Sequence, residues 1–126
     1  MPAFRLASLV PVFVVATAML QDARSQDVAA GKKLFVQDCS ICHSPKAGQN
    51  LVGPSLFSVV NRHSGQISGY HYSDANRNSG LTWNIATLDR YLSAPRQVVP
   101  GTKMTFPGLK DPKQRADVIA YLATLH

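Results

Sequence analysis

The hydrophobic and polar positions along the chain predict a first helix over residues 27–41. Asp27 is placed to cap its N-terminus, because a short carboxylate accepts hydrogen bonds from the backbone N–H groups that have no partner inside the helix. Apolar residues then recur at the three- to four-residue spacing of one helix face. The predicted members of that face are Val28, Gly31, Leu34 and Phe35.

Two further amphipathic stretches predict helices in the second half of the chain. Asn84 is placed to cap the first of them, and Pro95 ends it because the residue before a proline is disfavoured in helical geometry. Asp111 caps the second, with Pro112 in the first position, where proline is favoured. The apolar residues are Ile85, Leu88, Tyr91 and Leu92 in the first of these helices, and Val118, Leu122 and Leu125 in the second.

The segments between the helices are predicted to be loops. One short helical turn is expected around residues 56–61 and another after Ser73, in a stretch rich in Gly, Ser, Asn and His. Residues 97–109 are expected to form a loop that contains two Pro-Gly pairs. No segment predicts a strand, so the fold class is all-α with long loops. A small domain with this much ordered loop normally wraps around something, which predicts a bound cofactor.

Residues 1–25 predict a cleaved secretory signal peptide. Arg5 precedes an apolar run of 15 residues, which is shorter than the roughly 20 needed to span a membrane. Small residues at Ala23 and Ser25 then mark a cleavage site after Ser25, leaving residues 26–126 as one domain. Export predicts a bacterial periplasmic location and disfavours the mitochondrial intermembrane space. The alternative is a signal that stays on as a membrane anchor.

The chain is basic, with 13 Lys and Arg against 7 Asp and Glu and a net charge of +6 at pH 7. Nucleic acid is a poor partner for an exported chain, and the basic residues are scattered, with no run longer than Lys32-Lys33. Attraction to an acidic protein is the better interpretation. The alternative is that the charge only maintains solubility.

The strongest chemical signal is Cys39-Ser40-Ile41-Cys42-His43. Two thiols at this spacing can reach the two vinyl groups of a haem and form thioethers, and the next residue, His43, then lies under the iron as its proximal ligand. A structural disulfide would leave His43 unexplained. A thioredoxin-like pair expects a βαβ context, and a zinc site expects four ligands.

The second axial ligand is open on the residues alone. Met104 is the only methionine left after removal of Met1 and Met19, and it lies in a turn-rich loop that can bring its thioether over a flat ring. An equally good interpretation is a flexible core side chain, since methionine often fills that role. The rival histidine ligands are His63, His71 and His126.

Seven short motifs occur together and in the order found in one known family. They occupy residues 31–35, 39–43, 53–54, 72–76, 80–83, 100–104 and 119–122. In these motifs the chain resembles the small class I c-type cytochromes of the mitochondrial type, and most closely their bacterial periplasmic members. The resemblance implies a small cytochrome c fold, with three main helices and long loops around one covalent haem c held by Cys39 and Cys42.

The resemblance also implies a set of site residues. His43 and Met104 would be the two iron ligands, and the carbonyl of Pro54 would accept the second N–H of His43. Gly31 and Phe35 would pack the first helix against the last, near Tyr121. The other implied haem contacts are Tyr72 and Trp83 on the inner propionate, Arg62, Ser73 and Asn76 nearby, Tyr91 on the sulfur of Met104, and Thr102 at the propionate edge.

An iron with both axial positions filled leaves no place for substrate. The expected function is therefore that of a soluble one-electron carrier that cycles between Fe(II) and Fe(III) in electron transport, as in a respiratory chain, and is not an enzyme. The alternatives are a haem peroxidase or gas-binding protein, if Met104 is displaced, and a membrane-tethered carrier.

The resemblance implies a monomer with acidic redox partners, such as a cytochrome bc-type complex, an oxidase or a photosynthetic reaction centre. The basic ring expected around the exposed haem edge is thinned, because Asp38 and Gln97 stand where the family often has lysine. The side chains that fit the ring are Lys33, Arg96, Lys103 and Lys110.

Overall fold

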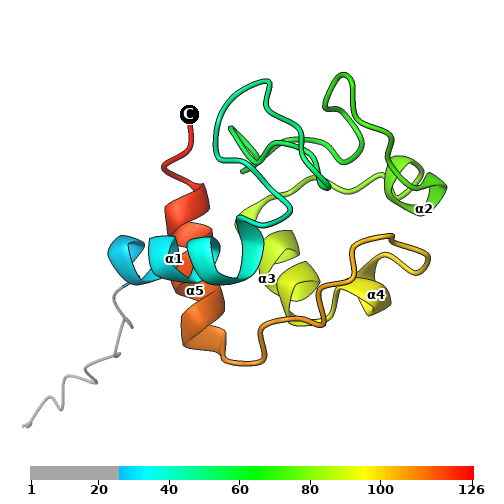
Figure 1. Ribbon diagram of the computed structural model, residues 1–126. Helices are drawn as coiled ribbons and strands as arrows, with labels where there is room; N and C mark the ends of the chain where they lie inside the picture. The colour runs from blue at the N-terminus through cyan, green and yellow to red at the C-terminus, as the bar shows by residue number, and fades with distance from the viewer. Residues whose placement is uncertain (1–25) are drawn as a thin grey trace, which may run out of the picture.

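In the computed structural model of the protein, which describes residues 26–126, the first and last helices pack against each other (Figure 1). α1 spans Val28–Leu34 and α5 spans Pro112–Leu122. Gly31 permits their close approach, because a Cβ atom at this position would lie 1.9 Å from the backbone oxygen of Asp117. The predicted signal peptide and its cleavage site lie outside the described residues.

Side chains of α5 and of the residues that flank α1 complete this crossing. The rings of Phe35 and Tyr121 lie 5.2 Å apart between centroids, which confirms the packing that the resemblance implied. Asp117 is buried, and its carboxylate accepts the backbone N–H of Asp27 at 2.9 Å and the ammonium of Lys113 at 2.6 Å. The buried carboxylate at the crossing is therefore paired with groups from both α5 and the residue before α1.

The first predicted helix is two elements in the structure. After α1 the chain enters η1, a π-helix over Phe35–Cys39, in which the N–H of Ser40 donates to the carbonyl of Phe35 at 2.8 Å. The α-helical spacing of apolar residues could not reveal this wider turn. The assignment of Val28 to the buried face was wrong, because it begins α1 and is 43% exposed.

The other predicted main helix, α3, spans Ile85–Ser93. Asn84 caps it as expected, since its side-chain oxygen accepts the N–H of Thr87 at 2.9 Å. Leu88 is buried, but Ile85 is 55% exposed in the first position of the helix, so its place on the apolar face was wrong. The three main predicted helices are confirmed as α1 with η1, α3 and α5.

Two short helices complete the described chain. α2 spans Asp74–Arg77, and Ser73 precedes it as predicted. α4 spans Pro95–Val98, so the proline that ends α3 also begins a new turn within a segment predicted to be loop from residue 97. Proline favours this position because its fixed φ suits a first helical residue.

The helical turn expected over residues 56–61 is present only as two separate turns, in which the N–H groups of Val59 and Arg62 donate to the carbonyls of Leu56 and Val59 at 3.2 and 3.0 Å. Ser58 and Asn61 have φ angles of +52° and +68°, which interrupt right-handed helical geometry. The only ladder-like contact in residues 26–126 is an isolated antiparallel bridge between His63 and Thr82. No helix in this part of the chain is long and apolar enough to cross a membrane.

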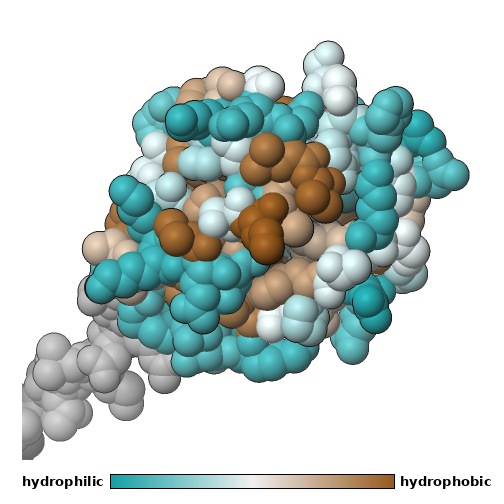
Figure 2. Space-filling model, in the orientation of Figure 1, coloured by the Kyte–Doolittle hydropathy of each residue, from teal (hydrophilic) through white to brown (hydrophobic). Residues whose placement is uncertain are grey.

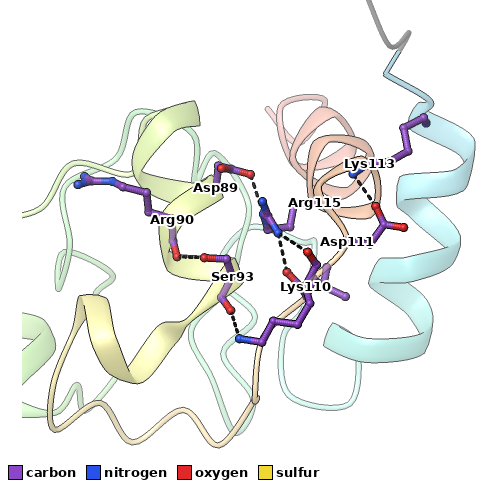
Figure 3. Close-up of polar contacts among 8 residues, drawn as sticks. Asp89, Arg90, Ser93, Lys110, Asp111, Lys113 and Arg115 are labelled. Carbon is purple, nitrogen blue, oxygen red and sulfur yellow. Dashed lines mark hydrogen bonds and ion pairs between the residues drawn. The ribbon is translucent and has the colours of Figure 1, made fainter.

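A polar network joins α3 to α5 on one side of the molecule (Figure 3). Arg115 donates from Nε to Asp89 at 2.7 Å and from a terminal nitrogen to the carbonyls of Leu109 and Lys110 at 2.9 and 3.0 Å. The ammonium of Lys110 in turn donates to the carbonyl of Ser93 at 2.5 Å. These bonds fix the chain between α4 and α5.

The core lies between the helices and the loops. Its buried side chains are Phe35, Val59, Trp83, Leu88, Tyr91, Val99, Leu109, Val118, Ile119, Tyr121 and Leu122. In Figure 1 the teal and green loops after η1 occupy the upper part of the view, whereas α4 and the segment leading to α5 lie at the lower right. Cys39, the last residue of η1, and Met104, in the segment leading to α5, both pack against the core.

Candidate functional site

The cysteine motif leaves the π-helix in a tight turn. The N–H groups of Cys42 and His43 both donate to the carbonyl of Cys39, at 3.0 and 2.8 Å. Both thiols are free in the structure, so the disulfide alternative is not formed. Burial, with a smaller contribution from Asp38 and Cys42, raises the pKa of the Cys39 thiol to about 11. A redox-active pair requires a readily formed thiolate, so this environment disfavours the thioredoxin-like alternative.

A hydrogen bond to the backbone fixes the orientation of the His43 ring. Its Nδ1 lies 2.7 Å from the carbonyl oxygen of Pro54. A carbonyl can only accept, so Nδ1 carries the proton and Nε2 keeps its lone pair. Burial, reinforced by the charge of Arg62 and opposed by the Pro54 bond, lowers the pKa of His43. The imidazole is thus neutral, which is the form that ligates a metal.

Gly53 has a role in this site that the sequence did not assign. A Cβ atom at this position would lie 2.4 Å from Cε1 of His43, and the N–H of Gly53 donates to the carbonyl of Cys42 at 2.7 Å. Only a residue without a side chain lets the loop backbone at this position lie against the imidazole of His43. The Gly53-Pro54 pair was the available signal, since both residues act on the same ring.

Met104 is the centre of a second group of side chains. It is half-buried, and the hydroxyl of Tyr91 donates toward its sulfur at 3.9 Å. The hydroxyl oxygens of Tyr91 and Thr102 lie 3.4 Å apart, and Thr102 accepts the N–H of Met104 at 3.3 Å. The ring of Trp83 packs 4.7 Å from that of Tyr91. Burial raises the pKa of Tyr91, so its hydroxyl stays protonated as a donor.

Arg62 belongs to a third group, which is incomplete by itself. Its two terminal nitrogens donate to the carbonyls of Phe57 and Ser55, each at 3.0 Å. Its Nε and the side-chain oxygen of Asn76 are buried and have no hydrogen-bond partner among the described residues. Buried polar groups are almost always paired, so these two atoms are exceptions within the described residues.

The remaining predicted residues have local partners. The hydroxyl oxygen of Tyr72 accepts the N–H of Ile67 at 3.2 Å, and that of Ser73 accepts the N–H of Asn76 at 3.0 Å as the cap of α2. The second and third groups are joined through the backbone, where the N–H of Trp83 donates to the carbonyl of Arg62 at 2.8 Å.

Other metal sites find no support in the described part of the chain. Residues 26–126 contain no group of three or more His, Cys, Asp and Glu side chains that could hold a bare metal ion, so the zinc alternative fails. His63, His71 and His126 are all exposed, unlike His43. His63 also bonds to Thr82 at 3.0 Å, and His126 to the carbonyl of Ala123 at 3.2 Å.

Comparison with known proteins gives one consistent answer. The sequence model of the family Cytochrome c matches residues 28–126. This chain belongs to the cytochrome c family. It is 52% identical over 99 residues to cytochrome c2 of Rhodopila globiformis, covering 79% of this chain and 93% of that protein. It is 53% identical over 98 residues to cytochrome c2 of Rhodoblastus acidophilus, covering 77% and 91%.

The family fold is also found in a solved structure. Cytochrome cH from Methylobacterium extorquens matches with a TM-score of 0.73 and 49% identity, over 78% of this chain and 98% of that chain. The expectation of a small all-α cytochrome c fold is therefore confirmed. As a member of this family the protein is an electron carrier with one covalently attached haem c, and it is not an enzyme.

The residues present fit such a group. The chain offers two free thiols, a neutral imidazole with Nε2 available, and a thioether. The unpartnered Nε of Arg62 is a donor that suits a haem carboxylate.

Proposed function

We propose that Cys39 and Cys42 bind the haem through thioethers, and that Nε2 of His43 and the sulfur of Met104 are the two iron ligands. The observation that carries this proposal is the 2.7 Å contact between Nδ1 of His43 and the carbonyl of Pro54. Because this contact occupies one ring nitrogen, only the other is available to a metal. When bound, the haem supplies an iron that gains or loses one electron.

The protein's own residues hold the site in one arrangement. Pro54 and Gly53 fix the plane and position of the His43 ring. The hydroxyl of Tyr91 orients the sulfur of Met104 and is itself positioned by Thr102. Side chains restrained in this way move little when the charge of the site changes, which favours fast electron transfer.

Arg62 and the residues around it are proposed to bind the acidic groups of the haem. We assign Arg62, Asn76, Trp83 and Tyr72 to the haem propionates, with Ser73 acting through the cap of α2. The unpartnered Nε of Arg62 supports this assignment, since a carboxylate would accept its N–H. The unpartnered oxygen of Asn76 can only accept, so it adds no support for a carboxylate. Burying a carboxylate beside a fixed guanidinium avoids leaving either charge unpaired.

We further propose that residues 1–25 are a cleaved signal, that the carrier works in the periplasm, and that it exchanges electrons with membrane-bound complexes. The support is the basic residue, short apolar run and small-residue site at the N-terminus. Without Arg5, Asp22 and Arg24 the chain keeps 11 basic and 6 acidic residues, and this net charge of +5 supports acidic partner surfaces such as those of a cytochrome bc-type complex, an oxidase or a reaction centre.

Spectroscopy of one variant tests the ligand assignment. We expect Met104→Ala to stay folded, to become high-spin or water-ligated, and to lose on the order of 0.1 V of reduction potential, a fraction of the ~0.8 V range that axial ligands span. The matched control is His63→Ala, which should keep the wild-type spectrum and potential. An unchanged ferric spectrum for Met104→Ala would mean that a residue other than Met104 ligates the iron. Intact mass of the exported protein tests both haem attachment and cleavage before Gln26.

A further inference from the structure

Two serine side chains, Ser64 and Ser79, form a hydrogen bond outside the set of proposed haem contacts. Their hydroxyl oxygens lie 2.8 Å apart, and Ser64 is only 5% exposed. Burying a hydroxyl costs free energy unless the hydroxyl is paired, so a serine at so buried a position indicates a specific bonding role.

The direction of each bond in this group follows from the hydrogens available. The hydroxyl of Ser79 donates to the backbone carbonyl of Asn76 at 2.9 Å. This bond uses its single hydrogen, so Ser79 accepts from the hydroxyl of Ser64. It also accepts the N–H of Leu81 at 3.4 Å. The Ser79 oxygen therefore uses its hydrogen and both lone pairs, and Ser64 is the donor that completes the group.

The serine pair joins the two segments of chain that carry the unpartnered buried atoms. Ser64 follows Arg62 by two positions on one segment, and Ser79 follows Asn76 by three positions on the other, just after α2. Nε of Arg62 and the side-chain oxygen of Asn76 are the two buried side-chain atoms without a partner among the described residues. The bond between the serines thus links the backbones from which these two side chains extend.

The position of α2 depends on contacts of this kind, because the helix has little apolar surface to bury. It is four residues long, and none of the four is buried. In Figure 2 the right-hand edge of the molecule, where Figure 1 places α2, is mainly hydrophilic. The segment after Ser64 also lies close to α2 at Gly65, where a Cβ atom would be 3.0 Å from Cα of Arg77. Short helices are marginal by themselves, so these contacts decide where α2 lies.

We infer that Ser64 and Ser79 are positioning residues, which hold Arg62 and Asn76 in a fixed relation within the proposed haem site and thereby influence the reduction potential. The inference rests on the proposed haem contacts of Arg62 and Asn76. A guanidinium beside a haem carboxylate balances its negative charge, and negative charge that is less well balanced favours Fe(III) over Fe(II). Loosening the link between the two segments should therefore lower the potential.

The test compares serine variants in the haem-loaded protein by redox titration. Ser64→Ala and Ser79→Ala should each lower the reduction potential, in the same direction as Arg62→Ala and by a smaller amount. Because Ser79→Ala already removes the bond to Ser64, adding Ser64→Ala to it should change the potential no further. Ser79→Thr keeps the hydroxyl and should restore the wild-type potential.

Ser93→Ala is the matched control. The hydroxyl of Ser93 donates to the carbonyl of Arg90 at 2.8 Å, three positions earlier, as that of Ser79 does to Asn76. Figure 3 shows that Ser93 belongs to the network between α3 and α5. Its loss should leave the potential unchanged. A second measurement follows the Nε–H resonance of Arg62 by NMR, which should move in Ser79→Ala and stay in place in Ser93→Ala.

Wild-type potentials in both alanine variants, alongside a shift in Arg62→Ala, would overturn the inference and leave the proposed haem contact of Arg62 intact. Additive shifts would show that the two hydroxyls do not act together, and Ser79→Thr behaving as Ser79→Ala would show that the hydroxyl is not the cause. Either result would overturn the inference, as would an equal shift in Ser93→Ala. An unchanged potential in Arg62→Ala would instead mean that the proposed haem contact is wrong, and the inference would fail with it.

Discussion

The α1–α5 crossing and the loops around His43 are built on opposite principles. At the crossing, Gly31 allows the two backbones to approach, and the rings of Phe35 and Tyr121 pack together. The buried carboxylate of Asp117 accepts three hydrogen bonds. In the loop region, the described chain leaves Nε of Arg62 and the oxygen of Asn76 buried without partners. The first region pairs its buried charge within the protein, whereas the second leaves two buried polar atoms without a partner among residues 26–126.

This difference teaches where folding energy comes from in a small carrier. Packing of α1 against α5 holds the first and last helices together. If the proposed haem site is right, the loops contribute ligands and donors whose burial is compensated when the cofactor binds, since a ligand that binds the folded state stabilises it. The predictions below separate the two regions.

The largest expected effect is on attachment. Replacing both thiols in Cys39→Ser/Cys42→Ser should abolish covalent haem, because a hydroxyl does not replace the thiol in thioether formation. Haem staining on a denaturing gel and intact mass measure the yield. Ser40→Ala, between the two, is the control and should attach haem normally. Full covalent yield from the double variant would disprove the assignment.

A pair of glycine variants distinguishes the regions most directly. Gly31→Ala places a Cβ atom 1.9 Å from a backbone oxygen of α5, so the helices must separate. We expect a loss of about 3 kcal/mol in the free energy of unfolding and an unchanged absorption spectrum. Denaturant titration followed at several wavelengths measures both.

Gly53→Ala should show the reverse signature. Its Cβ atom would meet the His43 ring at 2.4 Å, so the imidazole must shift and the ferric spectrum should change. Equal spectra for Gly53→Ala and wild type would mean that the ring position does not depend on the absence of this side chain. A changed spectrum in Gly31→Ala would mean that the two regions are coupled.

The buried carboxylate gives a smaller, pH-dependent effect. Hydrogen bonds from Lys113 and from the N–H of Asp27 lower the pKa of Asp117 from its usual 3.8. A carboxyl group with a lowered pKa stabilises the fold above its unfolded pKa and loses that contribution as pH falls through the folded value. Asp117→Asn should therefore cost about 1–2 kcal/mol at pH 7 and progressively less as the pH falls below 3.8.

Thermal unfolding across this pH range, with Asp111→Asn as the exposed-carboxylate control, tests the prediction. A deficit in Asp117→Asn that does not diminish in acid would assign the loss to packing and not to charge.

The smallest effect concerns the network in Figure 3. Asp89 is 46% exposed, and Arg115 keeps its bonds to two carbonyls without it. Asp89→Asn should lower the free energy of unfolding by no more than about 0.5 kcal/mol, and salt should reduce the difference. A loss of more than about 1.5 kcal/mol would show that the pair fixes the chain between α4 and α5.

The sequence predicted the helices well because their caps are local. Asn84, Ser73 and Asp111 each accept a backbone N–H two or three residues ahead, and this chemistry is readable from a short window. Burial at helix starts was less predictable. Val28 and Ile85 continue an apolar period but precede the residues that face another element.

The loops could not be predicted in the same way. Ser58 and Asn61 adopt positive φ angles that neither residue type requires, and the surrounding contacts impose them. The cysteine motif and Met104 were readable because their chemistry is rare. The role of Gly53 needed the fold, since the steric limit is set by His43, ten positions earlier.

The π-helix before the motif has a consequence for protein engineering. A turn closed by five residues in place of four uses one residue more than an α-helix does for the same advance. Deleting one residue between Phe35 and Cys39 would let the turn revert to α geometry and redirect both thiols around the helix axis. A designer who grafts residues 39–43 onto a regular helix therefore has to carry the surplus residue with them.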